Sequence, residues 1–387
     1  MNDYYSDLHI HIGRTNKGRA VKITGSRTLT LSNILHTASA NKGLDLIGII
    51  DSHSPEVLAE LEEYVRTGKM TELAQGGLLY EKTTLIMGSE LEIYDANCQG
   101  PIHVLAYLPT LQAMQAFSAW LSEHMKNIHL SSQRIYCDAR SLQQKVAELN
   151  GLFIPAHVFT PFKSLYGKGV MRSLTEVFDP TIIDAIELGL SADTDMVRGI
   201  EELAAYTFVT NSDAHSLGKI AREYQKIQME AANFEELRQA LHRKNGRAIV
   251  TNYGLHPLLG KYHETVCAAC GKAVKDEAGI CPFCHSKHIV RGVATRIQQL
   301  SSTTFTTVER PPYIHQVPLE FIPGLGKKTL DKLLAAFDTE MNILHRTTME
   351  QLLDIVPQQL AEKIILARTG QLAFEAGGGG VYGKIKL

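Results

Sequence analysis

Histidines and carboxylates follow short apolar stretches in the first part of the chain. His9 and His11 stand two residues apart in one such stretch, and side chains at positions i and i+2 of a strand project from the same face. Two imidazoles placed in this way can bind one metal ion. Comparable residues lie at or near other apolar stretches and complete the set of candidate ligands: Asp51, His53, Glu90, His103, His157, Asp213 and His215. A single histidine after a strand is usually structural, but this repetition predicts a shared metal centre.

This donor set suits the hydrolysis of phosphate esters. Attack on a phosphodiester builds negative charge on the attacking, leaving and non-bridging oxygens, and two metals ~4 Å apart can neutralise that charge and lower the pKa of a water. Mixed nitrogen and oxygen ligands suit zinc or manganese better than magnesium, whose sites are rich in oxygen. We therefore expect two or three divalent metals, with zinc or manganese preferred to magnesium.

A separate metal site is predicted from four of the six cysteines. Two Cys-x-x-Cys pairs are separated by ten residues, and four thiolates at this spacing can close a tetrahedral structural zinc site. The ligands of this predicted zinc ribbon are Cys267, Cys270, Cys281 and Cys284. The ribbon is compatible with a purely structural role and with a role in contacting DNA.

The candidate ligands need a framework that gathers the ends of several strands. Seven stretches are predicted as strands: 7–12, 44–50, 84–87, 102–108, 152–155, 184–188 and 207–210. Helical patterns at 55–67, 111–127 and 141–150 lie between several of them, and such alternation is typical of an α/β barrel or a doubly wound sheet. Strands that repeatedly end in functional residues favour a barrel. His103 lies near the start of its stretch and needs another geometry, such as a hairpin.

The motifs resemble those of the PHP family, the polymerase and histidinol-phosphatase superfamily. The resemblance rests on the opening His-x-His, on Glu90 and on the later His103, His157 and Asp213-x-His215. It implies a distorted seven-stranded β/α barrel with a first metal on His9, His11, Glu90 and Asp213. It also implies a second metal on Glu90, His103 and His157, and a third on His53 and His215. Residues 13–17 lack the ligand that the family places there, and Asp51 could compensate. The expected catalytic residues are Glu90, Asp213 and His215.

A Gly-x-Gly turn in the last part of the chain resembles the hairpin of the helix-hairpin-helix family. Gly324 and Gly326 precede Lys327 and Lys328, which open a helical pattern. Such a turn directs backbone N–H groups at a DNA phosphate. The sequence thus predicts a PHP barrel at 1–255, a zinc ribbon at 256–297 and a linker at 298–318. A helical DNA-binding region with a Gly-rich tail follows at 319–387.

Barrel, ribbon and hairpin region in this order resemble the endonuclease Q family of DNA-repair enzymes. The resemblance implies damaged DNA as the partner. It further implies cleavage on the 5′ side of a deaminated base (uracil, hypoxanthine or xanthine) or of an abasic site. Two stretches near the candidate ligands combine positive charge and aromatic rings and are expected to contact DNA. Their residues are Arg14, Lys17, Arg19, Lys22, Phe159, Phe162, Lys163, Tyr166 and Lys168.

Two other functions are compatible with parts of the sequence. A small-molecule phosphatase of the histidinol-phosphate type could use the same ligands, but the ribbon and the hairpin region would be superfluous. A non-catalytic DNA-binding scaffold could use those two regions, but it would not need a complete ligand set.

Composition narrows the class of protein further. A hydrophobic content of 44% with 21% charged residues is ordinary for a folded protein and argues against disorder. The formal net charge is −2, so any DNA-binding charge must be local. The sequence shows no signal peptide and no apolar run of ~18–20 residues, which predicts a cytoplasmic protein without a membrane span. Residues 371–374 partly match the pattern that binds a bacterial sliding clamp, which makes a clamp a further candidate partner.

Overall fold

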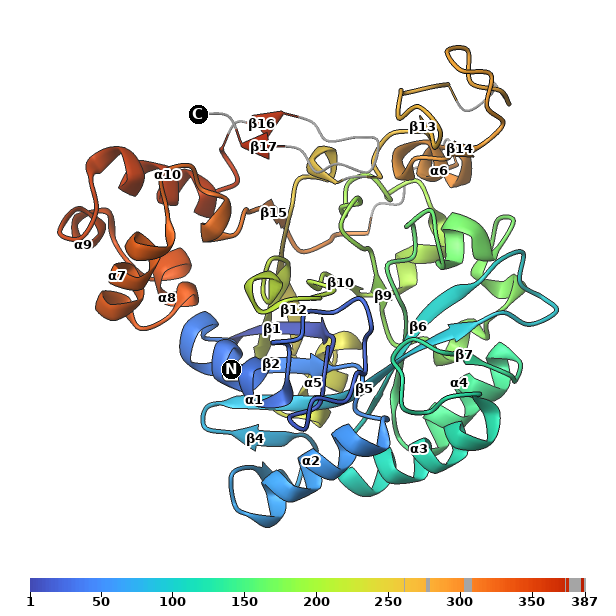
Figure 1. The fold of residues 1–387 in the computed structure, drawn as a ribbon, viewed down its shortest axis with the longest axis horizontal. Coiled ribbons are helices and arrows are strands. Elements are labelled where there is room, and N and C mark those ends of the chain that lie inside the picture. The colour runs from blue at the N-terminus through green and yellow to red at the C-terminus, as the bar shows by residue number, and fades with distance from the viewer. Residues whose placement is uncertain (261, 276–278, 303–307, 373, 376–383, 386–387) are drawn as a thin grey trace.

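The fold combines one long mixed sheet with flanking helices and two C-terminal parts (Figure 1). The computed structural model describes residues 1–260, 262–275, 279–302, 308–372, 374–375 and 384–385. The strands are β1 Asn2–Ile10, β2 Leu46–Ile49, β3 Thr71–Glu72, β4 Leu78–Tyr80, β5 Thr83–Ile93, β6 Ile102–Leu108, β7 Arg134–Ile135, β8 Leu152–Pro155, β9 Ile186–Glu187, β10 Phe208–Val209, β11 Tyr224–Met229, β12 Ala248–Gly254, β13 Val266–Cys267, β14 Ile289–Val290, β15 Tyr313–His315, β16 Phe374–Glu375 and β17 Lys384–Ile385. The α-helices are α1 Leu31–His36, α2 Pro55–Arg66, α3 Leu111–His124, α4 Ala139–Glu148, α5 Phe234–Leu241, α6 Val293–Leu300, α7 Lys327–Phe337, α8 Glu340–His345, α9 Met349–Leu353 and α10 Gln358–Arg368.

The middle of the long sheet consists of the strands that were expected to carry ligands. β2 pairs in parallel with both β1 and β5. β5 pairs antiparallel with β6, which pairs antiparallel with β8. On the other side, the sheet continues from β1 through β11 and β12 to β15. β9 and β10 form a separate parallel pair.

Backbone hydrogen bonds connect the β9–β10 pair to both sides of the long sheet. The amide of Asp184 donates to the carbonyl of Phe153 at 3.0 Å, which joins the chain before β9 to β8. The amide of Ala214 donates to the carbonyl of His9 at 3.1 Å, which joins the chain after β10 to β1. The strands with candidate ligands therefore lie around a common centre. The structure confirms the α/β class. Among the described residues the regular ladder is interrupted at these two places, so closure into a barrel stays a prediction.

The hairpin predicted for His103 is confirmed. β6 and β8 have the predicted bounds, whereas β5 continues to Ile93, beyond the predicted end at 87. The longer β5 forms a hairpin with β6 and sets Glu92 opposite His103. Every residue of β6 is buried, so the imidazole of His103 faces the interior of the protein.

Helices α2 and α3 pack together along one side of the sheet (Figure 1). Their buried apolar residues recur every three or four positions, which places them on one face of each helix. These residues are Val57, Leu58 and Leu61 in α2, and Leu111, Met114, Phe117 and Leu121 in α3. None of the described helices is both long enough and apolar enough to cross a membrane.

The stretch predicted as a linker, 298–318, contains ordered elements. α6 ends at Leu300, past the predicted boundary at 297, and β15 pairs in parallel with β12 so that Tyr313 lies opposite Asn252. The Ser/Thr/Pro-rich composition concealed this three-residue strand. β15 returns the chain to the sheet after the cysteine-rich part.

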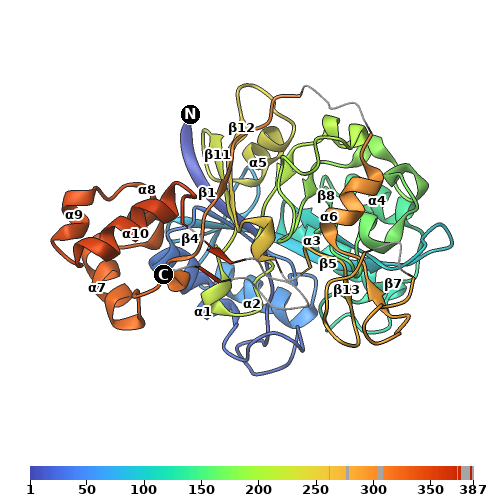
Figure 2. The ribbon, with the colours of Figure 1, turned by 90° about the horizontal axis from the view of Figure 1, so that it is seen from above.

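Helices α7–α10 form a group at one side of the core, opposite the cysteine-rich part (Figures 1 and 2). His345 at the end of α8 stacks on Tyr5, with ring centroids 4.5 Å apart, and its Nε2 lies 2.7 Å from Oη of Tyr224. Lys42 and Glu340 form a buried ion pair at 2.9 Å. The contacts of His345 hold the helical group against β1 and β11, and the Lys42–Glu340 pair holds it against residues 37–42.

A buried carboxyl group at the start of β11 makes stability depend on pH. Glu223 accepts a hydrogen bond from the amide of Leu255, while its Oε2 has no hydrogen-bond partner among the described residues. Burial raises the pKa of Glu223 from 4.5 to about 8. The folded state therefore favours the protonated acid, and this contribution is complete below pH 4.5 and is lost as the pH rises to about 8.

We predict that Glu223→Gln stabilises the protein relative to the wild type as the pH rises. The amide stays neutral in both states, whereas between the two pKa values the wild-type carboxyl ionises only in the unfolded state, which lowers stability by about 1.4 kcal/mol per pH unit. Urea unfolding at pH 6 and pH 8 should show the difference in stability shifting by about 2 kcal/mol in favour of the variant. An equal difference at both pH values would contradict the prediction.

Candidate metal centre

The candidate ligands come from five segments, four of the long sheet and one of the β9–β10 pair. His9 lies on β1, Glu90 on β5 and His103 on β6, while His157 follows β8 and Asp213 follows β10. His157 and Asp213 have positive φ angles of 31° and 46°. Residues other than glycine rarely adopt such angles, and the cost is usually accepted at functional sites. The backbone is bent at these two positions where their side chains meet the centre.

Glu90 is the residue on which the imidazoles converge. Its Oε1 lies 2.8 Å from Nδ1 of His103, 3.3 Å from Nε2 of His157 and 3.6 Å from Nε2 of His9. Its Oε2 lies 3.5 Å from Nε2 of His11. One carboxylate thus faces two sets of histidines, which is the position of a bridging ligand.

Asp213 completes a third group on the other side of His11. Its Oδ1 lies 3.5 Å from Nε2 of both His9 and His11, and 3.3 Å from Nε2 of His215. The potential ligand atoms of three groups each lie within 4.8 Å of one another. The groups are His9, His11 and Glu90; Glu90, His103 and His157; and His11, Asp213 and His215.

Two buried carboxylates contact Nδ1 of His9 and of His11 and thereby orient the two rings. Nδ1 of His9 lies 3.0 Å from Oε1 of Glu187, and Nδ1 of His11 lies 3.1 Å from Oδ2 of Asp51. A carboxylate on one ring nitrogen fixes the tautomer and turns the other nitrogen toward a metal. Asp51 therefore lies behind His11, not among the three groups, although it was a candidate ligand.

The electrostatics of the centre favour bound positive charge. Burial alone would raise the pKa of Glu90, but the charges of His103 and Lys22 hold that pKa well below its usual range. Burial alone would lower the pKa of His9, but Glu187 raises it well above its usual value. The carboxylates thus stay ionised and attract cations.

The residues present fit divalent metals. Nε2 of His9, of His11 and of His103 are buried and have no hydrogen-bond partner among the described residues. Buried polar atoms of this kind are costly unless they bind something. His53 is also fully buried, and neither of its ring nitrogens has a hydrogen-bond partner in the described part of the chain. His53 is not a member of the three groups, so its role in a third site stays a prediction.

The expectation that Phe159 and Tyr166 stack on DNA bases is wrong. Both side chains are buried, they stack on each other at 5.2 Å, and Oη of Tyr166 donates to Glu202. Their alternation with lysines in the sequence suggested a surface loop, but their rings belong to the core. Phe162 is instead 44% exposed and lies edge-on to Tyr262.

Phe162 and Tyr262 line a cleft of about 390 Å³ that opens on the metal centre. Basic residues of the same cleft include Lys22, Lys163 and Lys219. Lys163 forms an ion pair with Glu92 at 2.8 Å. The cleft therefore combines aromatic and cationic surface beside the candidate ligands.

A second groove lies between residues 161–168 and the cysteine-rich part. It has a volume of about 430 Å³, and Lys168, Lys287 and Arg291 line it together with Phe162. Because Phe162 lines both spaces, the groove adjoins the cleft.

The basic stretch after His11 divides into two kinds of residue. Lys22 points inward, with Nζ 3.2 Å from Oε2 of Glu90. Arg14 donates to the carbonyl of Gly18, Arg19 pairs with Glu56, and Lys17 is exposed. Lys22 is therefore part of the metal centre, a position that its sequence context did not indicate.

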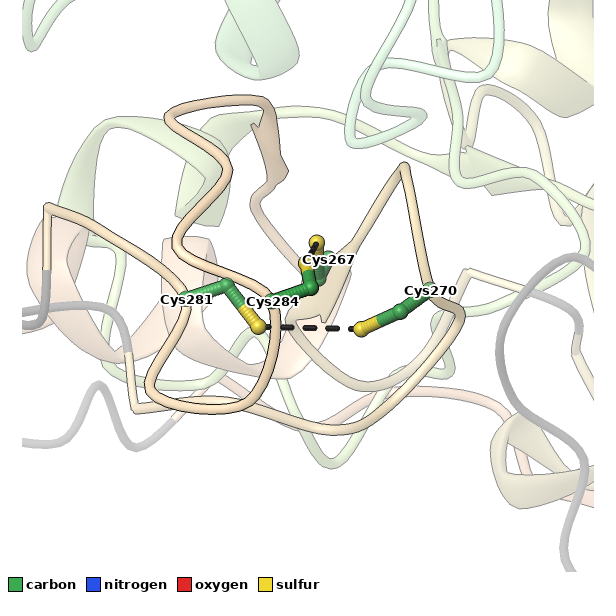
Figure 3. A group of neighbouring side chains, drawn as sticks. All are labelled: Cys267, Cys270, Cys281 and Cys284. Atoms are coloured by element: carbon green, nitrogen blue, oxygen red, sulfur yellow. Dashed lines mark hydrogen bonds between the residues drawn. The ribbon is translucent and has the colours of Figure 1, made fainter.

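The four cysteines of the predicted ribbon form one cluster (Figure 3). Cys267 and Cys284 have sulfurs 3.5 Å apart, and Cys270 and Cys281 have sulfurs 3.6 Å apart. These separations exceed the ~2 Å of a disulfide and are close to the ~3.8 Å expected of thiolates bound ~2.3 Å from one zinc. β13 and β14 pair antiparallel beside the cluster. The geometry fits one structural zinc.

The predicted Gly-x-Gly turn is open to solvent. Gly324 has a φ of 93°, and Gly326 caps α7. A Cβ added to either glycine would meet no atom within 4 Å, and Lys327 and Lys328 are exposed. Phosphate contact there stays a prediction. The clamp-binding pattern at 371–374 includes residue 373, and the Gly-rich tail spans 376–380; residues 373 and 376–380 lie outside the described residues.

Sequence reasoning missed Glu187 and Ser132. Glu187 interrupts the apolar stretch 184–188, and a carboxylate in a buried strand needs a partner, which was an available signal. Ser132 donates to Glu90 and accepts from Lys22 at 2.6 Å. It lies on a loop without a distinctive pattern.

Fold, ligand groups and cysteine cluster together define a metal-dependent hydrolase. No family model matches the chain. It is 57% identical over 386 residues to the uncharacterized protein YqxK of Bacillus subtilis, with 100% of both chains covered. The crystal structure of the lesion-specific endonuclease PfuEndoQ from Pyrococcus furiosus matches with a TM-score of 0.85 and 30% identity, over 100% of this chain and 96% of that one.

A complex of endonuclease Q with a 27-mer duplex that carries an abasic lesion at the active site matches equally well. The TM-score is 0.85 and the identity 30%, over 100% of this chain and 97% of that one. The chain belongs to the endonuclease Q family.

Glu90→Gln should reduce the metal content of the centre while the fold persists. The substitution removes the charge that two groups of histidines share, so divalent metals lose their common ligand. Metal analysis of the purified variant and its circular dichroism spectrum check this. Glu62→Gln is the control, because Glu62 is exposed on α2 and lies outside the three groups. Unchanged metal content in Glu90→Gln would refute the bridging position.

Cys270→Ser should remove about one zinc equivalent and destabilise the region around β13 and β14, because a structural zinc supplies local folding energy. The metals of the histidine centre should stay bound. Metal analysis combined with limited proteolysis distinguishes the two sites, with Cys137→Ser as the control. Loss of all metals together would show that the sites are coupled.

Proposed function

We propose that the protein is a metal-dependent DNA-repair endonuclease. It hydrolyses the phosphodiester on the 5′ side of a deaminated base (uracil, hypoxanthine or xanthine) or of an abasic site. The observation that carries the proposal is the full-length likeness to a lesion-specific endonuclease, together with a centre that gathers His9, His11, Glu90, His103, His157, Asp213 and His215.

The chain's own residues would position the phosphate and the metals. When bound, divalent metals at this centre supply an activated water and neutralise charge on the phosphate. Glu187 and Asp51 hold His9 and His11 with Nε2 toward the centre. Lys22, already 3.2 Å from Glu90, can place its ammonium beside a non-bridging phosphate oxygen. Lys163 and Lys219 extend the positive surface along the cleft.

The proposed lesions share one hydrogen-bonding edge. Uracil, hypoxanthine and xanthine each carry a carbonyl where the parent base has an exocyclic amine, beside a ring N–H. A pocket with a donor for that carbonyl and an acceptor for that N–H accepts all three. It rejects normal cytosine, adenine and guanine, because buried polar groups would stay unpaired at a cost of about 1–3 kcal/mol each.

Reading that edge requires the nucleotide to leave the base stack. Its unstacking costs a few kcal/mol and is easier for mispaired bases. The cleft of about 390 Å³ beside the metals, with Phe162 and Tyr262 in its wall, offers space and aromatic surface for such a base. Thymine has the same edge as uracil, so only a wall close to its methyl group can exclude it.

The observations favour this function over the two alternatives. A small-molecule phosphatase would not need the groove lined by Lys168, Lys287 and Arg291 or the exposed Gly324–Lys328 turn. A non-catalytic scaffold would not need three adjoining ligand groups.

The test is incubation with duplexes that carry uracil, hypoxanthine, an abasic site or no lesion, with the products mapped on a gel. We expect a nick on the 5′ side of each lesion, and faster cleavage of uracil opposite guanine than opposite adenine, because the mismatch opens more easily. Thymine opposite guanine should be cut at least about tenfold more slowly than uracil. Asp213→Asn, which loses a carboxylate of the centre, is the inactive control.

Three outcomes would contradict this proposal. Hydrolysis of a generic phosphomonoester without nicking of any lesion would favour the phosphatase. Equal nicking of damaged and undamaged duplexes would remove lesion specificity. Efficient cleavage of thymine opposite guanine would show that the protein senses distortion of the duplex, and the pocket would have to be abandoned.

A further inference from the structure

A short turn beside the metal centre has an apolar tip. The amide of Gly25 donates to the carbonyl of Lys22 at 2.9 Å, which closes a turn with Ile23 and Thr24 at its tip. The side chain of Ile23 is 73% exposed, more than any other large apolar side chain that the structure describes. Turn tips normally carry polar residues, glycine or proline.

Both ends of this turn are attached to the metal centre. On one side, Nζ of Lys22 contacts Oε2 of Glu90 at 3.2 Å and donates to Oγ of Ser132 at 2.6 Å. On the other side, the amide of Ser26 donates to the carbonyl of His215 at 2.8 Å. Ile23 follows Lys22 directly in the chain, so their Cα atoms are ~3.8 Å apart. The position of Ile23 is thereby fixed relative to the candidate ligands.

Two glycines let the turn approach the strand that carries the first ligands. A Cβ on Gly13, two residues after His11, would collide with the backbone carbonyl of Ser26. A Cβ on Gly25 would lie 3.1 Å from Cα of Gly13. The backbone of the turn therefore packs directly on the segment that follows β1, at Gly13, which leaves little freedom for its tip to move.

The surroundings of the tip favour an anionic partner with apolar surface. Lys17 and Arg27 are exposed in the same loop, and the metal centre beside the turn suits phosphate. A DNA strand combines such phosphates with flat apolar bases. Apolar side chains that enter between bases are a known way for proteins to unstack them.

We propose that Ile23 is a wedge that packs against the bases next to the scissile phosphate and fills the gap left by the displaced nucleotide. The inference rests on the proposed function and adds a positioning residue to it. Ile23 contacts the bases that stay in the duplex, and it supplies neither a metal ligand nor a contact to the lesion.

The test compares Ile23→Ser with Ile23→Leu and with Thr24→Ser, a control in the same turn. Each protein is assayed on uracil in a fully paired duplex and on the same strand without its complement. Ile23→Ser should cleave the duplex about tenfold more slowly than the wild type, because unstacking loses its apolar support. Cleavage of the single strand should be unchanged, because no duplex has to be opened. Ile23→Leu should restore duplex cleavage, and Thr24→Ser should resemble the wild type.

A fluorescence signal tests the wedge without cleavage. 2-Aminopurine placed next to the uracil brightens when it unstacks, and binding of wild-type protein should raise this signal more than binding of Ile23→Ser. If the wild type cut no lesion, the proposed function would fail. The fluorescence difference between the wild type and Ile23→Ser would still show whether Ile23 unstacks the neighbouring base. Equal losses on duplex and single strand, or equal fluorescence for both proteins, would overturn the inference.

Discussion

The placement of Glu90 governs the rest of the site. A carboxylate taken out of water costs several kcal/mol unless opposite charges and hydrogen-bond donors surround it. Here the partners come from β1, from β6, from the chain after β8 and from the turn at Lys22. Each of these segments places a side-chain nitrogen 2.8 to 3.6 Å from an oxygen of this one carboxylate. The strained φ angles of His157 and Asp213 follow from the same demand, since both side chains have to reach this small volume.

The parts of the fold that sequence could predict are those that local chemistry dictates. Runs of mostly apolar residues predicted the bounds of β6 and β8, because strands buried on both faces are largely apolar. The repetition of candidate ligands at or near predicted strands indicated His9, His11, Glu90, His103, His157, Asp213 and His215, and the structure brings these residues together. The spacing of Cys267, Cys270, Cys281 and Cys284 was sufficient by itself, because all four lie within one short segment.

The parts that could not be predicted depend on distant segments. Phe159 and Tyr166 stand among lysines and polar residues, and only tertiary packing shows that they are buried. Asp51 has the sequence context of a ligand, but β1 places His11 between it and the centre. β15 is three residues long, and although Tyr313 and Ile314 suit a strand, its stability comes from pairing with β12, which the local sequence does not show. The inward orientation of Lys22 also depends on a distant residue, because its ammonium group pairs with the carboxylate of Glu90 on β5.

The pairing of β15 with β12 makes the ribbon an insertion, not an appended tail. Ile314 lies opposite Tyr253, so the chain leaves the sheet and returns to it at neighbouring positions. Arg296 of α6, within this excursion, donates to the carbonyls of Tyr166 and Val170 in the core. The ribbon is thus connected to the sheet at both ends and hydrogen-bonded to the core through Arg296. A segment attached in this way stays at a high, constant local concentration beside the core. The backbone that frames the basic groove between ribbon and core is therefore positioned before a partner binds, which lowers the ordering cost of binding.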